Sequence, residues 1–568
     1  MKVFTLLKQE INPIPYRLIV FGLVSGLSSA LLISVVNSAA ETISNNESNG
    51  YHLIVYTLGL GVFFFTKRYT LDRSSEIVEL VANRIRYRLA DKIRLTELTT
   101  LEKYGAATIY ARISQDVTTV SNISMLLINA AQELIVIIFI LFYIAAISFW
   151  SFGLIIVISA FGVFYYTENA GFFYSMFLKR SEKQVAIFAR ISHVLQGFNE
   201  ININRRKNEE VFEAYTKAEK DSRDVQIKIG KRYNVTLIII ELLLYMSLGL
   251  ILFALPKIHV EHSLVITKVV AAVIFIVGPL SGIVYTIPLF GLASDAAGNI
   301  IKLEAQLEEE LQQIREQKID NYSPAAYQMI PFESQIVLKG LSYQYPQRTD
   351  QGKGFQIGPF DFTFRKGDLI FVTGGNGSGK STFLKLLTGL YKPKSGQIKV
   401  DGGEDQKGRF IYAQNYQQYQ NLFSIIFSDY HLFDKIYGLE QEVDPDQVNT
   451  LLQNMGLPEE KTTYRDGAFT NIMLSSGQKK RLALTTVLLE DKPIYVFDEV
   501  AADLDPEFRD KFYFEIIQEL KARNKTVFVV SHDQQYWNAS DRLIQFQDGQ
   551  MRELSREEVR FLVKMVTK

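Results

Sequence analysis

Gly374-Gly375-Asn376-Gly377-Ser378-Gly379-Lys380-Ser381-Thr382 is the stretch that decides how this chain is organised. Its glycines let the backbone curl so that consecutive N–H groups point into one concavity, where they can hold phosphate oxygens. Four of its residues (Gly374, Gly379, Lys380 and Ser381) match the spacing G-x-x-x-x-G-K-[ST] of a phosphate loop. We therefore expect a nucleotide to bind at residues 374–382.

The segments around this loop predict an α/β domain. Residues 368–373 form a short apolar run with the length of a buried strand, and helical periodicity begins at Phe383. The loop thus lies between a strand and a helix, as the motif requires. Residues 336–345 and 355–364 also alternate or cluster like strands. A Gly-rich turn without a ligand is the plainer alternative, and this context weighs against it.

Composition restricts the partners of the chain. The 568 residues include 61 basic and 61 acidic side chains, so there is no bulk attraction to nucleic acid, and we expect no nucleic-acid partner. There is no cysteine and there are only six histidines, which excludes disulfides, and we expect no zinc site. The length suggests about two to four domains.

Apolar residues are concentrated in the first half of the chain. Long apolar runs occupy residues 16–292 and are absent afterwards, which predicts a membrane domain followed by a soluble one. The first run is longer than a signal-peptide core, so no cleavable signal is expected. A buried core helix is the alternative for any single run. Six spans are expected near residues 16–40, 51–67, 124–148, 151–167, 236–256 and 264–292.

Charge predicts the orientation of these spans. The segment after the second span is rich in Lys and Arg from Lys67 to Arg94, whereas residues 41–50 carry neither. Because basic residues stay on the cytoplasmic side, both termini and the soluble domain are expected in the cytoplasm. The two cytoplasmic connections, near 68–123 and 168–235, contain few Gly or Pro residues. Read as a helix out and a helix back, each arm would reach roughly 40 Å below the membrane.

Two carboxylates and one proline are notable within the spans. Glu133 and Glu241 are candidates for a substrate cavity, because an ionised carboxylate in lipid usually faces a cavity or a partner. An ion pair between helices near the interface is the alternative for each. Pro279, after Gly278, is expected to kink the last span because it removes a backbone hydrogen bond.

Acidic residues end a second apolar strand in the soluble domain. Residues 494–499 read Ile-Tyr-Val-Phe-Asp-Glu. Behind a phosphate loop, Asp498 can hold Mg²⁺ through water, and Glu499 can orient or deprotonate the attacking water. The plainer alternative is a strand that simply ends in acids.

A helix start lies about twenty residues before these acids. Leu474-Ser475-Ser476-Gly477-Gln478 opens a helix whose hydroxyls and N-terminus favour an anion. An ordinary capped helix start would be the reading elsewhere. Here the pentapeptide resembles the signature of ATP-binding-cassette (ABC) transporters. That resemblance implies an ATP-binding role for Ser475, Ser476, Gly477 and Gln478.

The resemblance extends to further positions of the cassette. It implies that Tyr345 stacks on adenine, although a strand-edge tyrosine is the alternative. It also implies that His532, within Ser-His-Asp, contacts the γ-phosphate and works with Glu499 in catalysis. Asp505 ends a segment similar to the loop after the catalytic acid. Ser428 departs from the pattern, because the family places there a glutamine that contacts Mg²⁺ and water.

The wider sequence resembles one exporter group within that family. Residues 423–433, 474–484 and 497–506 look like bacterial cyclic-peptide and siderophore exporters, and residues 197–206 resemble the coupling region of that group. The resemblance implies a six-span α-helical membrane domain of the type IV exporter kind over residues 1–301. It further implies a helical linker over 302–333 and an α/β P-loop ATPase domain over 334–568.

The function implied is ATP-driven export by alternating access. One phosphate loop and one signature per chain imply a homodimer in the bacterial inner membrane, with ATP and Mg²⁺ as cofactors and a peptide-like substrate. Ser381 and Asp498 would hold the metal. The arms near 104–112 and 197–204 would transmit the movement of the cassettes. A lipid or lipopeptide flippase, or an ATP-gated regulator that transports no peptide, are the alternatives.

Overall fold

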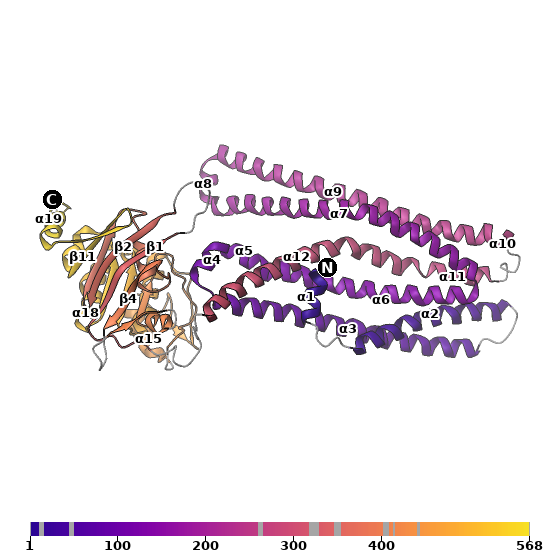
Figure 1. The fold of residues 1–568 in the computed structure, drawn as a ribbon, viewed down its shortest axis with the longest axis horizontal. Helices are drawn as coiled ribbons and strands as arrows, with labels where there is room; N and C mark the ends of the chain where they lie inside the picture. The colour runs from indigo at the N-terminus through magenta and orange to yellow at the C-terminus, as the bar shows by residue number, and fades with distance from the viewer. Residues whose placement is uncertain are drawn as a thin grey trace. The chain divides into compact units, whose positions relative to one another are not determined.

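The computed structural model describes residues 2–10, 16–44, 50–258, 265–316, 329–345, 354–401, 408–412, 415–439 and 443–566. These residues divide into two compact units (Figure 1). The first unit contains residues 1–95 and 104–308, and the second contains residues 96–103 and 309–568. Each unit is described by itself below.

The first unit consists of helices that run nearly side by side along most of their length (Figure 1). Its long helices are apolar over part of their length and charged over the rest, as expected for spans that continue into cytoplasmic arms. The main helices are α1 (Lys2–Glu10), α2 (Tyr16–Ser44), α3 (Gly50–Arg94), α5 (Ala106–Ala111), α6 (Val117–Ile147), α7 (Phe149–Gln196), α8 (Phe198–Ile203), α9 (Arg205–Gly249), α10 (Leu255–Ile258), α11 (Ile266–Ile274) and α12 (Val277–Glu316).

Five helical segments of the described chain are long and apolar enough to cross a membrane: Tyr16–Ile43, Ala106–Ile147, Phe149–Gln196, Arg205–Lys257 and Ile266–Gln312. They coincide with five of the six expected spans. The sixth, residues 51–67, forms the first part of α3 but is not among them. It falls outside this group because Tyr51, His52 and Lys67 lower the mean hydropathy of a run of only seventeen residues, and the expected count of six spans stays a prediction.

The last span is interrupted as its proline requires. Helix α11 ends at Ile274 and α12 begins at Val277, so the break precedes Pro279 by a few residues. Proline has no N–H to donate to the carbonyl four residues earlier, which is that of Phe275. The expected kink therefore lies one turn before the Gly278-Pro279 pair.

In the first unit, α1 packs on α3, α6 and α12. Val3 and Leu6 are fully buried against Ile85, Leu89 and Ala297. Ion pairs surround this contact: Arg88 binds Glu10 and, at 2.6 Å, Glu304, and Lys92 binds Glu304 at 3.0 Å and Glu308 at 2.8 Å. Apolar burial and paired charges thus join the N-terminal helix to the arms.

The second unit is an α/β domain with a mostly parallel central sheet (Figure 1). Its strand order is β12-β11-β3-β10-β9-β6, and only β12 runs antiparallel to its neighbour. The strands are β3 (Leu369–Gly374), β6 (Phe423–Ile426), β9 (Ile494–Asp498), β10 (Thr526–Val530), β11 (Arg542–Gln547) and β12 (Gln550–Leu554). The residues of β9 and β10 are all buried, which explains their unbroken apolar sequences.

An antiparallel sheet, two short strands and several helices complete this unit. The antiparallel sheet has the order β2-β1-β4-β5 and buries a cluster of phenylalanines on one face. Its strands are β1 (Gln335–Gln344), β2 (Gln356–Arg365), β4 (Ser395–Asp401) and β5 (Arg409–Phe410). The remaining elements are α4 (Leu98–Tyr104), α13 (Lys380–Leu387), α14 (Tyr416–Gln420), α15 (Pro445–Asn454), β7 (Tyr464–Arg465), β8 (Ala468–Phe469), α16 (Ser476–Leu489), α17 (Pro506–Lys511), α18 (Ile517–Ala522) and α19 (Arg556–Val566).

Parallel strands place the candidate chemistry at one edge. Residues that follow the carboxyl ends of neighbouring parallel strands lie together, and β3, β10 and β9 are such neighbours. The phosphate loop follows β3, Asp498 ends β9, and Ser531 follows β10. The expected fold class, a helical membrane domain followed by an α/β domain, is confirmed.

Candidate nucleotide-hydrolysing site

The phosphate loop has the backbone conformation that its glycines predict. Gly374 has a φ of 147°, and a Cβ atom there would lie 2.3 Å from the carbonyl oxygen of Phe546. Gly379 has a φ of 111° and precedes the first turn of α13. Both positions exclude larger residues, because left-handed φ values and close backbone approach favour glycine. The loop therefore ends at a helix N-terminus, which attracts anions.

Lys380 lies across the curled loop. Its Nζ donates hydrogen bonds to the carbonyl oxygens of Gly374 at 3.0 Å and Gly375 at 3.2 Å. The lysine is buried, and Gly375, Asn376 and Gly377 next to it are exposed. Ser378 Oγ is buried without a hydrogen-bond partner among the described residues. An ammonium and free donors are thus held at the place where phosphate oxygens would bind.

The next loop residue meets the end of β9. Ser381 Oγ donates to Asp498 Oδ2 at 3.2 Å. Asp498 is only 1% exposed, and within the described residues its Oδ1 has no hydrogen-bond partner. A buried carboxylate oxygen without a partner is costly, and a cation removes that cost. The hydroxyl and the carboxylate are the oxygen ligands that Mg²⁺ prefers, so this pair fits Mg²⁺.

Burial raises the pKa of Asp498, and the neighbouring charge of Glu499 raises it further. Hydrogen bonding from Ser381 and from Ser428 lowers it again in part. Ser428 follows β6, next to β9, and so lies beside Asp498, the carboxylate expected to hold Mg²⁺. The residue that replaces the family's glutamine therefore lies at the site, with a side chain too short to make the same contact at the water.

Glu499 and His532 are brought together from two strands. His532 Nε2 lies 3.2 Å from Glu499 Oε1, and the two side chains are 47% and 38% exposed. That exposure leaves room for water beside the carboxylate. Glu499 has a φ of 53°, which is unusual for a residue with a side chain. The pair thus has the geometry of a base held by an orienting neighbour.

Tyr345 is connected to the same loop. Its hydroxyl lies 3.1 Å from Thr382 Oγ1 and 3.4 Å from the hydroxyl of Tyr391. Its ring packs edge-on against Tyr343 and Tyr391, with centroids 5.2 and 5.9 Å apart. The structure therefore places the residue expected to stack on adenine beside the phosphate loop.

The signature residues begin helix α16, and among the described residues they form no hydrogen bond with the phosphate loop of the same chain. Ser475 caps α16, accepting from the N–H of Gln478 at 3.4 Å, and the Gln478 side chain accepts from the N–H of Ser475 at 3.2 Å. Ser476 is exposed, and a Cβ atom on Gly477 would lie 2.8 Å from the carbonyl oxygen of Asp503. Across the described residues, no hydrogen bond or ion pair joins 475–478 to 374–382.

Asp505 has two structural partners in this chain. It caps α17 by accepting from the N–H of Phe508 at 3.0 Å, and it pairs with Arg481. The N–H of Phe508 and the Arg481 guanidinium hold the pKa of Asp505 below its usual value. Its ATP-binding role stays a prediction, and its present contacts fix the turn after the 3₁₀ helix Val500–Asp503.

Sequence reasoning missed Lys480 in the signature helix. Its Nζ donates to the carbonyl oxygen of Glu499 at 2.9 Å and forms an ion pair with Asp503 at 2.8 Å. No local sequence pattern predicts these contacts, because Glu499 and Asp503 follow Lys480 by nineteen and twenty-three positions. A basic residue one turn into the helix was the only available signal.

The segment of the first arm that packs in the second unit precedes the expected one. Glu102 of α4 accepts from the hydroxyl of Tyr391 at 2.6 Å and from Lys385 Nζ at 2.9 Å, and Glu97 binds Lys392. We expected the arm to act through residues 104–112. These contacts lie at Glu97 and Glu102, where acidic side chains match this surface, and the role of residues 104–112 in transmitting movement stays a prediction.

The two candidate membrane carboxylates differ in their surroundings. Glu133 of α6 binds Lys67 of α3 at 3.4 Å. Glu241 of α9 is exposed, and among the described residues it forms no ion pair. It borders a small depression together with Tyr245 and Ser281. Both remain predictions as substrate residues, but only Glu241 lacks a partner of opposite charge in the described chain.

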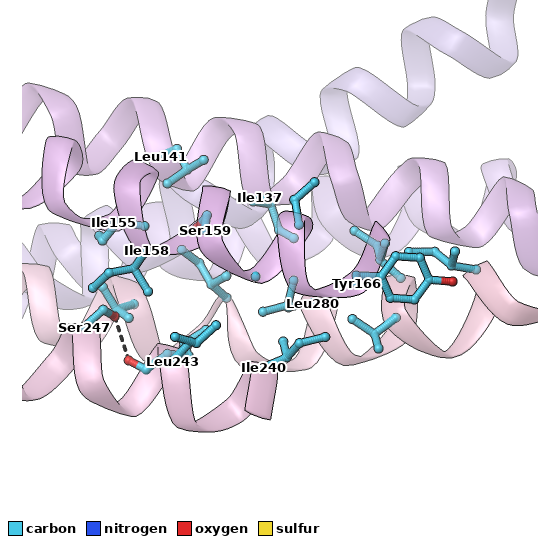
Figure 2. A pocket seen from close by; sticks show the side chains of 18 residues that line it. Ile137, Leu141, Ile155, Ile158, Ser159, Tyr166, Ile240, Leu243, Ser247 and Leu280 are labelled. Carbon is cyan, nitrogen blue, oxygen red and sulfur yellow. Dashed lines mark hydrogen bonds between the residues drawn. The ribbon is translucent and has the colours of Figure 1, made fainter. Parts of the chain in front are cut away.

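A larger apolar pocket adjoins this depression (Figure 2). It lies between α6, α7, α9 and the α11–α12 span and has a volume of about 250 Å³. Ile137, Ile158, Ile240 and Leu280 converge in it. Eighteen residues line it, and most of them are aliphatic.

Comparison with known proteins agrees with this geometry. The family model described as ABC transporter matches residues 357–502. The ATP-binding protein SyrD of Pseudomonas syringae pv. syringae is 30% identical over 542 residues, which cover 93% of this chain and 92% of that relative. The chain belongs to the ABC transporter family.

Other relatives match the ATPase domain alone. The nisin transport ATP-binding protein NisT of Lactococcus lactis subsp. lactis is 27% identical over 234 residues, 39% of this chain and 37% of that protein. An energy-coupling factor transporter ATP-binding protein of Oenococcus oeni is 33% identical over 226 residues, 38% of this chain and 77% of that protein. This ABC transporter binds and hydrolyses ATP, and its membrane helices precede the ATPase domain as in exporters.

Proposed function

We propose that two copies of this exporter form a homodimer that moves a cyclic peptide, a peptide-like natural product or a siderophore across the bacterial inner membrane. Similarity along almost the whole chain to one relative supports an exporter with both domains in one polypeptide. The positive residues from Lys67 to Arg94 support cytoplasmic termini and a cytoplasmic ATPase domain.

The incomplete ATP site is the observation that supports a dimer. The phosphate loop, Asp498, Glu499 and His532 lie together, but among the described residues no hydrogen bond or ion pair joins residues 475–478 of the same chain to them. In this family an ATP molecule lies between the loop of one cassette and the signature of the other. The partner's Ser475 and the partner's Gly477 would therefore complete the site, and a twofold dimer would contain two such sites.

The residues of this chain account for the hydrolytic step. Lys380 and the loop N–H groups bind the phosphates, and Glu499 orients a water and takes its proton as the oxygen attacks the γ-phosphorus. The bond to the ADP oxygen breaks as the new bond forms, and His532 holds Glu499 and the γ-phosphate region. Mg²⁺, held by Ser381 and Asp498, would supply charge neutralisation on the phosphates.

Alternating access would follow from closure of the two cassettes. ATP binding would draw the cassettes together, and α4 and the region 197–204 would pass this movement to the membrane helices. Release of the products would let the cassettes separate. Glu102, bound to Tyr391 and Lys385, is the contact that joins the first arm to its cassette.

Transport by the purified, lipid-reconstituted protein tests this proposal. Cyclic peptides, lipopeptides and siderophores would be screened for stimulation of ATP hydrolysis, followed by ATP-dependent uptake into inside-out vesicles. We expect at least one peptide-like compound to stimulate hydrolysis and to accumulate. Hydrolysis without accumulation would favour an ATP-gated regulator. Translocation of labelled phospholipid without peptide uptake would favour a flippase.

A further inference from the structure

The apolar pocket of the first unit has few polar side chains in its wall, namely Ser159, Tyr166 and Ser247. Among the residues that line it, Ser247 donates its hydroxyl to the carbonyl oxygen of Leu244 at 2.6 Å and so offers no free donor (Figure 2). Tyr166 lies at the end of the pocket opposite Ser247, with its hydroxyl directed away from Ser247. Most of the wall between them is aliphatic, so the pocket selects for an apolar group.

The volume suits part of a ligand. Pockets that enclose whole drug-sized molecules measure about 300–1,000 Å³, and this one has about 250 Å³. An apolar tail could lie between the helices while the rest of the molecule stays outside. The part of the molecule that stays outside would then need a polar contact near the pocket.

Glu241 supplies that contact. The depression it borders shares Ile240, Leu244, Leu280 and Val284 with the apolar pocket, so the two lie next to each other. A carboxylate inside an apolar span usually faces a cavity or a partner. Glu133 has Lys67 as its partner, whereas in the described chain Glu241 forms no ion pair. Its charge favours a cationic group and disfavours an anionic phosphate.

We propose that this site binds an exported amphipathic molecule, with its acyl or similar apolar tail in the pocket and its amine at Glu241. The proposal rests on the proposed export function and narrows its substrate class to acylated, amine-bearing peptides. The carboxylate argues for the cargo over an anionic membrane lipid as the occupant.

Two glycines on α7 provide a matched pair of variants. Gly162 lines the pocket, and a Cβ atom there would make an ordinary contact with Leu243 at 3.6 Å. Gly153 is on the same helix, does not line the pocket, and a Cβ atom there meets nothing within 4 Å. Gly162→Leu therefore fills the pocket, and Gly153→Leu makes the same chemical change elsewhere.

The probes are a synthetic cyclic peptide with one lysine, the same peptide with a decanoyl tail, and the acylated peptide with acetylated lysine. For the wild type, we expect the acylated amine to stimulate hydrolysis at a concentration about tenfold lower than the peptide without a tail. Gly162→Leu should remove this advantage, and Gly153→Leu should retain it. Glu241→Gln should remove the preference for free over acetylated lysine.

The outcomes separate this proposal from the export function. Stimulation and uptake that are equal with and without the tail would preserve peptide export and overturn the pocket assignment. A tail effect that survives in Gly162→Leu would also overturn it. Labelled phosphatidylethanolamine movement that alone responds to Gly162→Leu would assign the pocket to membrane lipid. If no peptide stimulates hydrolysis or accumulates, the export function itself fails.

A separate observation in the second unit concerns Lys480. This lysine side chain is 8% exposed and binds both the Glu499 carbonyl oxygen and the Asp503 carboxylate. A buried ammonium needs such partners, because desolvation of a charge is costly. Glu499 has a left-handed φ of 53°, a conformation that the surroundings must hold in place. Lys480 is a neighbour that holds it.

We infer that Lys480 is a positioning residue for the catalytic carboxylate. Through it, the signature helix α16 fixes the backbone from which the Glu499 side chain projects toward water. The ion pair with Asp503 holds the following 3₁₀ helix at the same time. Loss of the ammonium should leave nucleotide binding intact and misplace the base.

Lys480→Met tests this inference with Lys479→Met as its control, because Lys479 is the adjacent lysine and less buried. We expect Lys480→Met to lower kcat about 10- to 100-fold with KM for ATP nearly constant, and Lys480→Arg to restore part of the rate. Asp503→Asn should lower kcat less, since the carbonyl contact remains. Equal losses in kcat and nucleotide affinity, or no rescue by arginine, would reduce Lys480 to a residue that only supports folding.

Discussion

The ATP site and the membrane pocket recognise their ligands by opposite means. The ATP site contains directed contacts between polar side chains, such as Ser381 with Asp498 and His532 with Glu499. In the membrane pocket the wall is mostly aliphatic, and Glu241 at its margin forms no ion pair within the part of the chain that the structure describes. Directed donors need fixed spacing in the sequence, whereas an apolar wall needs only shape. The first kind of site can be found from a motif, and the second needs a structure.

The strongest test of this contrast is the loss of one directed group. Glu499→Gln keeps the shape of the side chain but cannot take a proton from water. We expect ATP turnover to fall by about 10² or more, with ATP binding retained. Steady-state hydrolysis and nucleotide binding in the same preparation would measure both. Turnover close to that of the wild type would remove Glu499 from its catalytic role.

A smaller effect on ATP binding is expected at Tyr345, whose ring is expected to stack on adenine and whose hydroxyl contacts Thr382 and Tyr391. Tyr345→Ala removes the stacking surface, which is worth about 1–3 kcal/mol or roughly five- to 150-fold in KM for ATP. Tyr345→Phe keeps the ring, loses only the hydroxyl contacts with Thr382 and Tyr391, and should change KM by less than about fivefold. ATP titrations of both variants measure this difference. Equal effects of the two substitutions would show that the ring does not bear on adenine.

The smallest predicted effect concerns pH. Burial and then the charge of Glu499 raise the pKa of Asp498, so this carboxylate takes up a proton at a higher pH than an exposed aspartate. Mg²⁺-dependent nucleotide binding should therefore weaken as pH falls into the mildly acidic range. Glu499→Gln removes one cause of the raised pKa of Asp498 and should make binding persist to lower pH.

Titrations of Mg²⁺ at several pH values would check this prediction with nucleotide binding as the signal, since the variant hydrolyses slowly. An acid sensitivity that increases in Glu499→Gln would contradict the assigned cause. The same titration in the membrane-pocket variant Gly162→Leu should match the wild type, because the ATP site is unchanged in it.

Much of the ATPase fold could be predicted from sequence. The apolar strand before the phosphate loop and the strand before Asp498 are buried, uninterrupted runs, and parallel pairing brings their ends together. The side-chain contacts across the chain could not be predicted. Lys480 reaches Glu499 and Asp503 only because α16 packs beside the end of β9.

The membrane domain was less predictable in detail. The sequence predicts six spans, and five of them are long and apolar enough among the described helices; residues 51–67 fall short because the run is short and leads into the charged part of α3. Glu133 and Glu241 have equal standing in the sequence, and only the packing of α3 against α6 supplies Lys67 to one of them. A pairing that joins residues sixty-six positions apart carries no local signal.

The central claim is that the ATP site is completed by a second copy of this chain, and disulfide trapping tests it most directly. The absence of cysteine makes introduced thiols specific, and Asn376 and Ser476 are exposed on the loop and the signature. Chains carrying Asn376→Cys would be mixed with chains carrying Ser476→Cys, both with Glu499→Gln, and oxidised with and without ATP and Mg²⁺. The account predicts an ATP-dependent covalent dimer, because a disulfide needs Cα atoms within about 7 Å. No dimer in this mixture under any nucleotide condition, while ATP is bound, would contradict it.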